Sequence, residues 1–170
     1  MAVEEFEEQP SSGGPWLLRS ITEKLALAGG ILIVGAGLLV CASVGMRWVT
    51  SDSIPGDFEF VQIAVALSAF AFLPYCQMRR GNISVGTFTT RLPERMRAGI
   101  DALWDLTYAF VAGFIAWRLS VGALETIANK TTTMVSGLPI GWAIAAVAVM
   151  AAMLAVAASA AAVQLLRSPR

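Results

Sequence analysis

The 170-residue sequence contains no histidine and only two cysteines, and each scarcity removes a class of function. Without histidine, the chain lacks the commonest protein ligand of haem, zinc and copper and the usual general base at neutral pH. The cysteines, Cys41 and Cys76, lie in separate apolar runs, so we interpret them as buried apolar side chains rather than as a disulfide or metal pair. The sequence therefore predicts neither a metal site nor a cofactor.

Charged residues are also scarce. They make up 14% of the chain, whereas a soluble domain carries about a quarter. Apolar residues make up 56%, and the mean hydropathy is +0.68, so the surplus apolar surface indicates a lipid bilayer as solvent. The formal net charge is zero, which gives no indication of a nucleic-acid partner. No nucleophile elbow, phosphate-binding loop or CxxC pair is present, so we expect no enzyme.

The apolar runs predict an all-α, polytopic membrane protein with four transmembrane helices. A helix needs about 20 apolar residues to cross the hydrocarbon core. Runs that can do so cover residues 25–46, 58–77, 101–124 and 139–166. We expect the last helix to start at Pro139, because proline is tolerated in a first turn. Its 28 residues would then exceed the core thickness and require a tilt.

The first fifteen residues, "MAVEEFEEQPSSGGP", are acidic and then rich in serine, glycine and proline, and this composition predicts a disordered tail. A secretory signal peptide would start basic, so we expect the first apolar run to persist in the mature chain. Residues 1–15 are thus predicted to be a tail, and residues 16–170 a single four-helix membrane domain.

Basic residues alternate in density between the segments that flank the predicted spans. Nine of the twelve lie before the first span, between the second and third, or after the last. The positive-inside rule therefore predicts that both termini and the middle connection are cytoplasmic.

The middle connection predicts a short interfacial helix between the second and third spans. After Arg79, Arg80 and Gly81, the segment "ISVGTFTTRL" places Val85, Phe88 and Leu92 at spacings of three and four, on one helical face. Such a helix would lie in the plane of the membrane and contact lipid. An ordinary polar loop with coincidental spacing is the alternative.

Polar residues near the span ends suggest ion pairs rather than catalysis. Glu59 and Arg47 lie at the same predicted face, and we expect a structural pair between them, because charges near a bilayer are costly unless paired or wet. Alternatively both sit among headgroups, or Glu59 couples transport to an ion. Asp101 and Asp105, one turn apart, could share a proton, but solvation or pairing with nearby arginines is the better interpretation.

Tryptophans and small residues indicate how the helices are anchored and packed. Trp48, Trp104, Trp117 and Trp142 lie near predicted span ends and are interpreted as membrane anchors. Small residues recur at steps of four, which lets helices approach closely in lipid. These are Gly37, Cys41 and Gly45 in the first span and Ala151, Ala155 and Ser159 in the last. They predict packing faces, either toward a partner membrane protein or within the chain.

Two segments in order resemble one known family. "GDFEFVQIAVALSAFAFLPYCQMRRGNISVGTFTTRLP" (residues 56–93) is similar to the second span and following loop of the small membrane subunit of TRAP (tripartite ATP-independent periplasmic) transporters. "TTTMVSGLPIGW" (residues 131–142) resembles the segment that leads into that subunit's fourth span. Asn82 and Gly86 depart from the family, which often has histidine and an acid there.

The resemblance implies a non-catalytic subunit of a secondary, sodium-coupled transporter of organic acids. In that family the small subunit forms a heterodimer with a large membrane subunit, which carries the substrate and sodium sites. A periplasmic substrate-binding protein delivers the solute, and the resemblance thus implies a place in a bacterial inner membrane. The small subunit is thought to scaffold the moving part. The alternative is a self-sufficient, oligomeric small transporter that uses Glu59 as its coupling carboxylate, and a redox membrane anchor is excluded by the missing histidines.

Overall fold

The computed structural model describes residues 16–52, 54–79 and 94–167, and these residues form four helices and no strand. They are α1 (Trp16–Thr50), α2 (Asp57–Met78), α3 (Glu94–Ala128) and α4 (Gly141–Arg167). The all-α, four-span prediction is therefore confirmed. The predicted tail and the predicted interfacial helix lie outside the described residues, together with Arg80, Gly81, Val85, Phe88 and Leu92.

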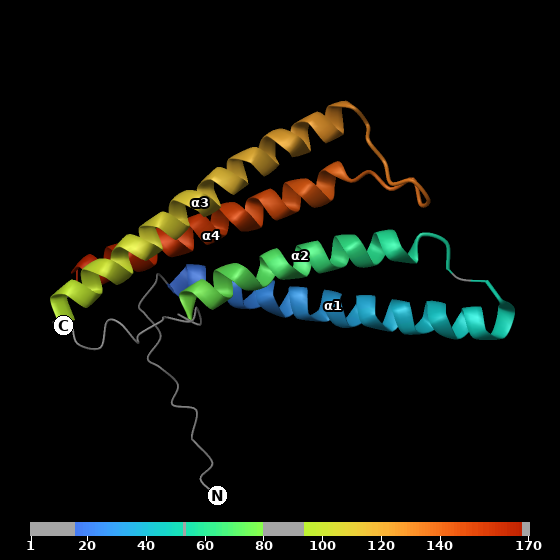
Figure 1. The fold of residues 1–170 in the computed structure, drawn as a ribbon, viewed down its shortest axis with the longest axis horizontal. Coiled ribbons are helices and arrows are strands. Elements are labelled where there is room, and N and C mark those ends of the chain that lie inside the picture. The colour runs from blue at the N-terminus through green and yellow to red at the C-terminus, as the bar shows by residue number, and fades with distance from the viewer. Residues whose placement is uncertain (1–15, 53, 80–93, 168–170) are drawn as a thin grey trace, which may run out of the picture.

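The helices form two antiparallel hairpins, α1 with α2 and α3 with α4, which contact each other through α2 and α4 (Figure 1). One end of the bundle holds the start of α1 and the end of α4, and we call it the termini end. The other holds the connections of residues 51–56 and 129–140, and we call it the loop end. The hairpins lie closest at the termini end and spread apart toward the loop end (Figure 1).

All four helices are long and apolar enough to cross a membrane. Their spans run Leu18–Thr50, Asp57–Met78, Gly99–Ala128 and Gly141–Val163, and only 17–39% of each most apolar window is buried within the chain. The remaining apolar surface faces outward all along the helices, with Leu27, Phe110 and Val149 each more than 60% exposed. Such a surface suits lipid, so the chain is a multi-pass membrane protein.

The first three helices are longer than predicted, and the fourth begins two residues later than predicted. α1 and α3 have 35 residues each, or about 52 Å at 1.5 Å per residue. α4 begins at Gly141 rather than at Pro139, because Pro139 forms an isolated antiparallel bridge with Thr132. The run from residue 131 onward, which carries no charge, therefore starts as a small folded loop and not as helix.

Close helix packing in the first hairpin depends on small residues spaced seven apart. Thr22, Gly29, Ala36 and Ser43 are the four buried positions of α1 whose burial is described. At the centre of the contact, the Ser68 hydroxyl donates to the Gly29 carbonyl oxygen at 2.9 Å. A Cβ added at Gly29 would lie 2.9 Å from the Cβ of Ala71, which is closer than such atoms approach. The hairpin therefore requires a glycine at this point.

Alanine dominates the packing of the second hairpin. The buried face of α4 includes Ala151, Ala157, Ala158 and Ala162, each at most 1% exposed. Small side chains let helices approach closely where lipid provides no hydrophobic drive for association. The dense core between α3, α4 and α2 follows from this composition.

Candidate functional site

Glu59, in the first turn of α2, is the most unusual polar residue that the structure describes. Its side chain lies at the loop end, within an apolar span, and the residue is only 7% exposed. Its two carboxylate oxygens accept hydrogen bonds from consecutive backbone N–H groups of the α3–α4 connection. Val135 N donates to Oε1 at 2.8 Å, and Ser136 N donates to Oε2 at 2.9 Å.

These bonds join the two hairpins where they are otherwise farthest apart (Figure 1). A buried carboxylate is costly unless it is hydrogen-bonded, and a hydrogen bond to a charged group contributes about 1.5–3 kcal/mol. Consecutive N–H groups pointing to one side form a concave anion site. We call Glu59 together with the N–H groups of Val135 and Ser136 the carboxylate clamp.

The loop that supplies the N–H groups is shaped before it meets the carboxylate. Thr133 N donates to the carbonyl oxygen of Leu138 at 2.9 Å, and Leu138 N donates to the hydroxyl of Thr133 at 3.0 Å. Gly137 adopts a φ of 64°, in the left-handed region that suits glycine. The loop is thus a miniature hairpin whose tip presents its N–H groups to α2.

Gly56 fits the start of α2 against this tip. It caps the helix with a φ of 79°, and a Cβ placed on it would overlap the Ser136 hydroxyl. Both the backbone conformation and the lack of space therefore require glycine. The clamp thus depends on a carboxylate and on the glycine three residues before it.

The structure gives Glu59 different partners from the predicted one. Among the described residues, its carboxylate bonds the loop, and the expected ion pair with Arg47 does not form. Arg47 instead lies at the end of α1 near Asp57, whose carboxylate accepts hydrogen bonds from the Ser43 hydroxyl and from Phe58 N. Loop backbone donors satisfy Glu59 better because they converge on both oxygens, whereas Arg47 is exposed.

A second polar contact joins the hairpins at the termini end. The buried amide of Gln77, near the end of α2, donates to Oδ1 of Asp105 on α3 at 2.9 Å. Asp105 thus has an amide partner, while the side chains of Arg80, Arg95 and Arg97, its predicted partners, lie outside the described residues. Glu59 and Gln77 are 18 residues apart on α2, or about 27 Å. The two polar contacts therefore lie near opposite membrane faces.

Arg79, just after α2, makes two weak contacts at the same end. It approaches Glu23 of α1 at 3.9 Å and lies 5.3 Å from the ring centre of Tyr75. Both charged side chains of the ion pair are well exposed, so it contributes little to stability.

The predicted tryptophan anchors are all exposed, as lipid-facing or interfacial residues must be. Trp48 lies in the last turn of α1 and Trp142 at the second residue of α4, both at the loop end. Trp104 lies toward the termini end. Trp117 lies deeper than predicted, about three turns before the end of α3, because that helix continues to Ala128. Anchoring by these residues stays a prediction.

The predicted small-residue faces divide into two groups. Ala151 is buried in the chain, and Ala155 lies 3.9 Å from the position of a Cβ at Gly113, so this part of α4 packs internally. Ser159 is exposed and donates to Val156 O of its own helix. Gly37, Cys41 and Gly45 are exposed, and a Cβ placed on either glycine would meet nothing within 4 Å among the described residues. Cys76 is exposed too, so the expectation of buried cysteines is wrong.

These polar contacts connect the helices and the loop to one another. Within the described part of the chain, no three His, Cys, Asp or Glu residues cluster as metal ligands would. Sequence reasoning singled out Glu59 and missed its partners, Val135 and Ser136, and it also missed Gly56. Gly56 and Gly137 adopt positive φ values in two turns, but the partners of Glu59 are backbone groups, which no sequence pattern identifies.

Comparison with known proteins identifies a family. The family model described as "Tripartite ATP-independent periplasmic transporters, DctQ component" matches residues 36–168, which is most of the chain and includes both polar contacts. No curated protein and no solved structure matches.

Proposed function

The chain belongs to the DctQ component family of the tripartite ATP-independent periplasmic transporters, and from this premise we propose that it is a scaffold for the large transport subunit. In this proposal the transporter is a sodium-coupled symporter of organic acids. The large subunit binds and moves the solute, and a periplasmic binding protein delivers it on the loop-end side. The chain lies in the bacterial inner membrane with both termini in the cytoplasm.

The observation that carries the scaffold role is the carboxylate clamp. A scaffold must resist displacement, and Glu59 fixes the spacing of two hairpins where they diverge. The Gln77–Asp105 contact does the same at the termini end. The side chains of Glu59, Gln77 and Asp105 are thus engaged in bonds between parts of the chain itself.

The same contacts argue against a self-sufficient transporter that couples through Glu59. A coupling carboxylate has to bind and release an ion, and such sites lie near the bilayer midplane. Glu59 lies in the first turn of its helix, and both of its oxygens accept backbone hydrogen bonds. Release of an ion there would require the loop to detach at each cycle.

The proposal is tested by reconstitution. The chain is co-expressed with a large membrane subunit and a periplasmic binding protein of a tripartite transporter, sought in the reading frames that neighbour its own. The solute is first identified by thermal shifts of the binding protein with a panel of organic acids. We expect the two membrane subunits to co-purify, and liposomes to take up the solute only with both of them, the soluble component and a sodium gradient. Solute uptake by the chain alone would contradict the scaffold role.

A further inference from the structure

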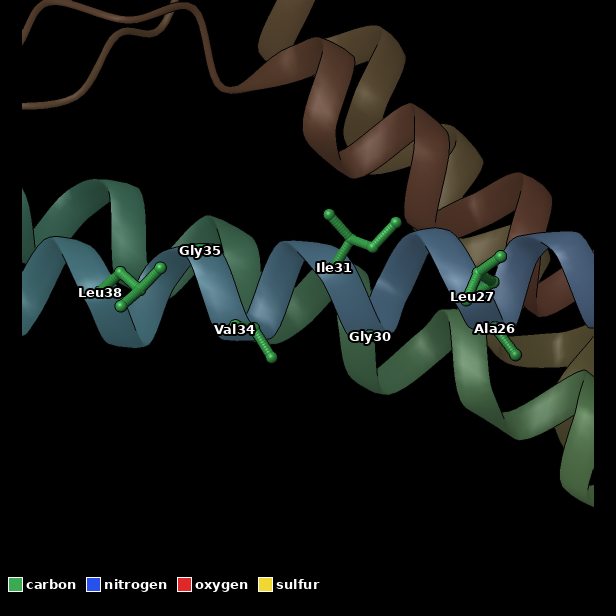
Figure 2. Close-up of a pocket in the computed structure, with 7 residues that line it drawn as sticks. All are labelled: Ala26, Leu27, Gly30, Ile31, Val34, Gly35 and Leu38. Carbon is green, nitrogen blue, oxygen red and sulfur yellow. The ribbon is translucent and has the colours of Figure 1, made fainter.

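Two large apolar side chains are exposed at the tip of the α3–α4 loop, outside any helix. Met134 is fully exposed and Val135 is 64% exposed. Elsewhere such side chains project from membrane-spanning helices, as those of Leu27, Ile31 and Leu38 do along α1 (Figure 2), and lipid accounts for their exposure. A place on a spanning helix does not explain the exposure of Met134 and Val135, which we call the apolar tip.

The loop that carries the apolar tip has the composition and the bonding of a segment that meets little water. Residues 131–140 carry no charge. Six of their nine backbone N–H groups donate to oxygen atoms of the chain. The donors are Thr131, Thr133, Val135, Ser136, Leu138 and Ile140. Water satisfies N–H groups in an ordinary surface loop, whereas close to lipid chains the protein has to supply the acceptors. The Glu59 carboxylate supplies two of them beside the tip, so the carboxylate clamp suits a loop placed where water is scarce.

The clamp holds the apolar tip beside the first turn of α2, short of the end of α1. The Ser43 hydroxyl donates to the carboxylate of Asp57, so Ser43 lies level with the first residue of α2. From there α1 continues to Thr50, about 10 Å farther. Figure 1 shows the loop folding back toward α2 and reaching less far along the bundle than α1 does.

The last two turns of α1 show how far the lipid-facing surface extends at the loop end. Val44, Trp48 and Val49 are 63–92% exposed, and they belong to the apolar span Leu18–Thr50. Phe58, the second residue of α2, is 73% exposed. The lipid-facing surface of the first hairpin therefore includes the level at which the clamp holds the apolar tip.

We propose that the apolar tip inserts into the bilayer at the loop end and that its partner there is lipid. The loop backbone lies among the headgroups, and the side chains of Met134 and Val135 enter the boundary with the acyl chains, because apolar surface leaves water favourably. The tip thus fixes the depth of the second hairpin, and the clamp carries that constraint to α2. The lipid contact requires only that the chain spans the bilayer, and it does not depend on the scaffold role.

The accessibility of a spin label tests the contact. In a chain freed of its cysteines by Cys41→Ala and Cys76→Ala, a nitroxide is attached to Met134→Cys, and the full chain is placed in liposomes of phosphatidylethanolamine and phosphatidylglycerol. Oxygen concentrates in lipid and a polar nickel chelate in water, so their collision rates with the label report its surroundings. Phe110→Cys, an exposed position within the span of α3, is the lipid reference, and Asp52→Cys, in the α1–α2 connection, is the water reference.

We expect collisions with oxygen to exceed those with the nickel chelate at residue 134, as at residue 110, and the reverse at residue 52. If the label at residue 134 behaves like the label at residue 52, the tip lies in water and the proposal is wrong. If neither reagent reaches residue 134, protein covers the tip and the proposal is equally wrong.

The same measurement in the assembled transporter separates lipid from a protein partner. The labelled chain is reconstituted with the large subunit and the periplasmic binding protein, and we expect the excess of oxygen collisions at residue 134 to persist. Loss of collisions with both reagents on assembly would mean that a protein subunit receives the tip, which would overturn the proposal. Subunits that fail to associate would contradict the scaffold role, and the excess of oxygen collisions in the chain alone would still support the lipid contact.

Discussion

Glu59 and Val135 lie 76 residues apart in the chain, yet the backbone N–H of Val135 donates to Oε1 of Glu59 at 2.8 Å. The bond connects the first turn of α2 to the tip of the α3–α4 loop. It ties the hairpins together at the end where their helices diverge (Figure 1). The Glu59 carboxylate therefore links the two hairpins at the loop end.

Replacing that carboxylate should loosen the bundle. In Glu59→Gln, the amide offers one acceptor oxygen and turns its NH₂ group toward the second backbone N–H, which loses its partner. We expect a loss of about 1–3 kcal/mol in the free energy of unfolding, measured by thermal or denaturant unfolding of the detergent-purified chain. Glu125→Gln, an exposed glutamate of α3, is the control and should have no effect. If Glu59→Gln is as stable as Glu125→Gln, the clamp does not stabilise the bundle.

Gly56 should tolerate alanine less well than Gly137 does. Both adopt a positive φ, but only at Gly56 would a Cβ overlap the Ser136 hydroxyl. We therefore expect Gly56→Ala to destabilise the chain more than Gly137→Ala, which bears only backbone strain of about 1 kcal/mol. The double variant Gly56→Ala with Ser136→Ala should recover the difference. If the double variant unfolds no later than Gly56→Ala does, the overlap is not the cause.

Adjacent glycines in α1 should respond differently to alanine. Gly29 packs against Ala71 of α2, whereas a Cβ at Gly30 meets nothing in the chain. Gly29→Ala should separate the first hairpin and lower the unfolding temperature. Gly30→Ala should leave that temperature unchanged or raise it, because alanine is the better helix former by about 1 kcal/mol. If Gly30→Ala lowers the unfolding temperature more than Gly29→Ala does, α1 contacts α2 through a different face.

The contact at the termini end should appear as a coupling energy. In a double-mutant cycle with Gln77→Ala and Asp105→Ala, we expect the unfolding free energies to be non-additive by about 1 kcal/mol. Thr107→Ala is the control, since its hydroxyl donates to Leu103 within α3. Its effect should add to that of Gln77→Ala. If the effects of Gln77→Ala and Asp105→Ala on the free energy of unfolding are additive, the hydrogen bond does not hold the hairpins together.

The predicted orientation can be checked by labelling. In a chain freed of its cysteines, Cys41→Ala and Cys76→Ala, a cysteine replaces Asp52 at the loop end or Met96 near the termini end, both exposed. A membrane-impermeant maleimide applied to spheroplasts should label the residue-52 variant at once. It should label the residue-96 variant only after permeabilisation, because the basic residues favour the cytoplasm there. The opposite pattern would invert the topology.

The four spans could be predicted because a bilayer imposes a length and a composition on each helix. Residues 58–77 were predicted, and α2 covers Asp57–Met78. The structure of the segment before α4 was harder to predict. Its uncharged residues include no helix breaker between Thr131 and Ser136, so hydropathy could not separate the loop from the helix. The hydrogen bonds of Thr133 with Leu138 decide the difference, and they depend on tertiary context.

The packing faces could be predicted only in part. Small residues at steps of four were singled out in α1 at Gly37, Cys41 and Gly45, but the face toward α2 repeats every seven residues and includes Gly29. A helix rich in glycine and alanine carries several small-residue stripes, and the sequence does not rank them. Likewise, the partners of Glu59 are backbone groups, which every residue except proline carries and which no sequence pattern identifies.

The distance in sequence between Glu59 and its loop has a consequence for synthesis on the ribosome. At about 5–20 residues per second, the α3–α4 loop is translated roughly 4–15 seconds after Glu59. During that interval the nascent first hairpin holds an acidic side chain that has no bonding partner yet, so it has to stay near water at the bilayer surface. The arrival of the loop then withdraws that side chain from water, and insertion of the last two helices completes the assembly of the first two.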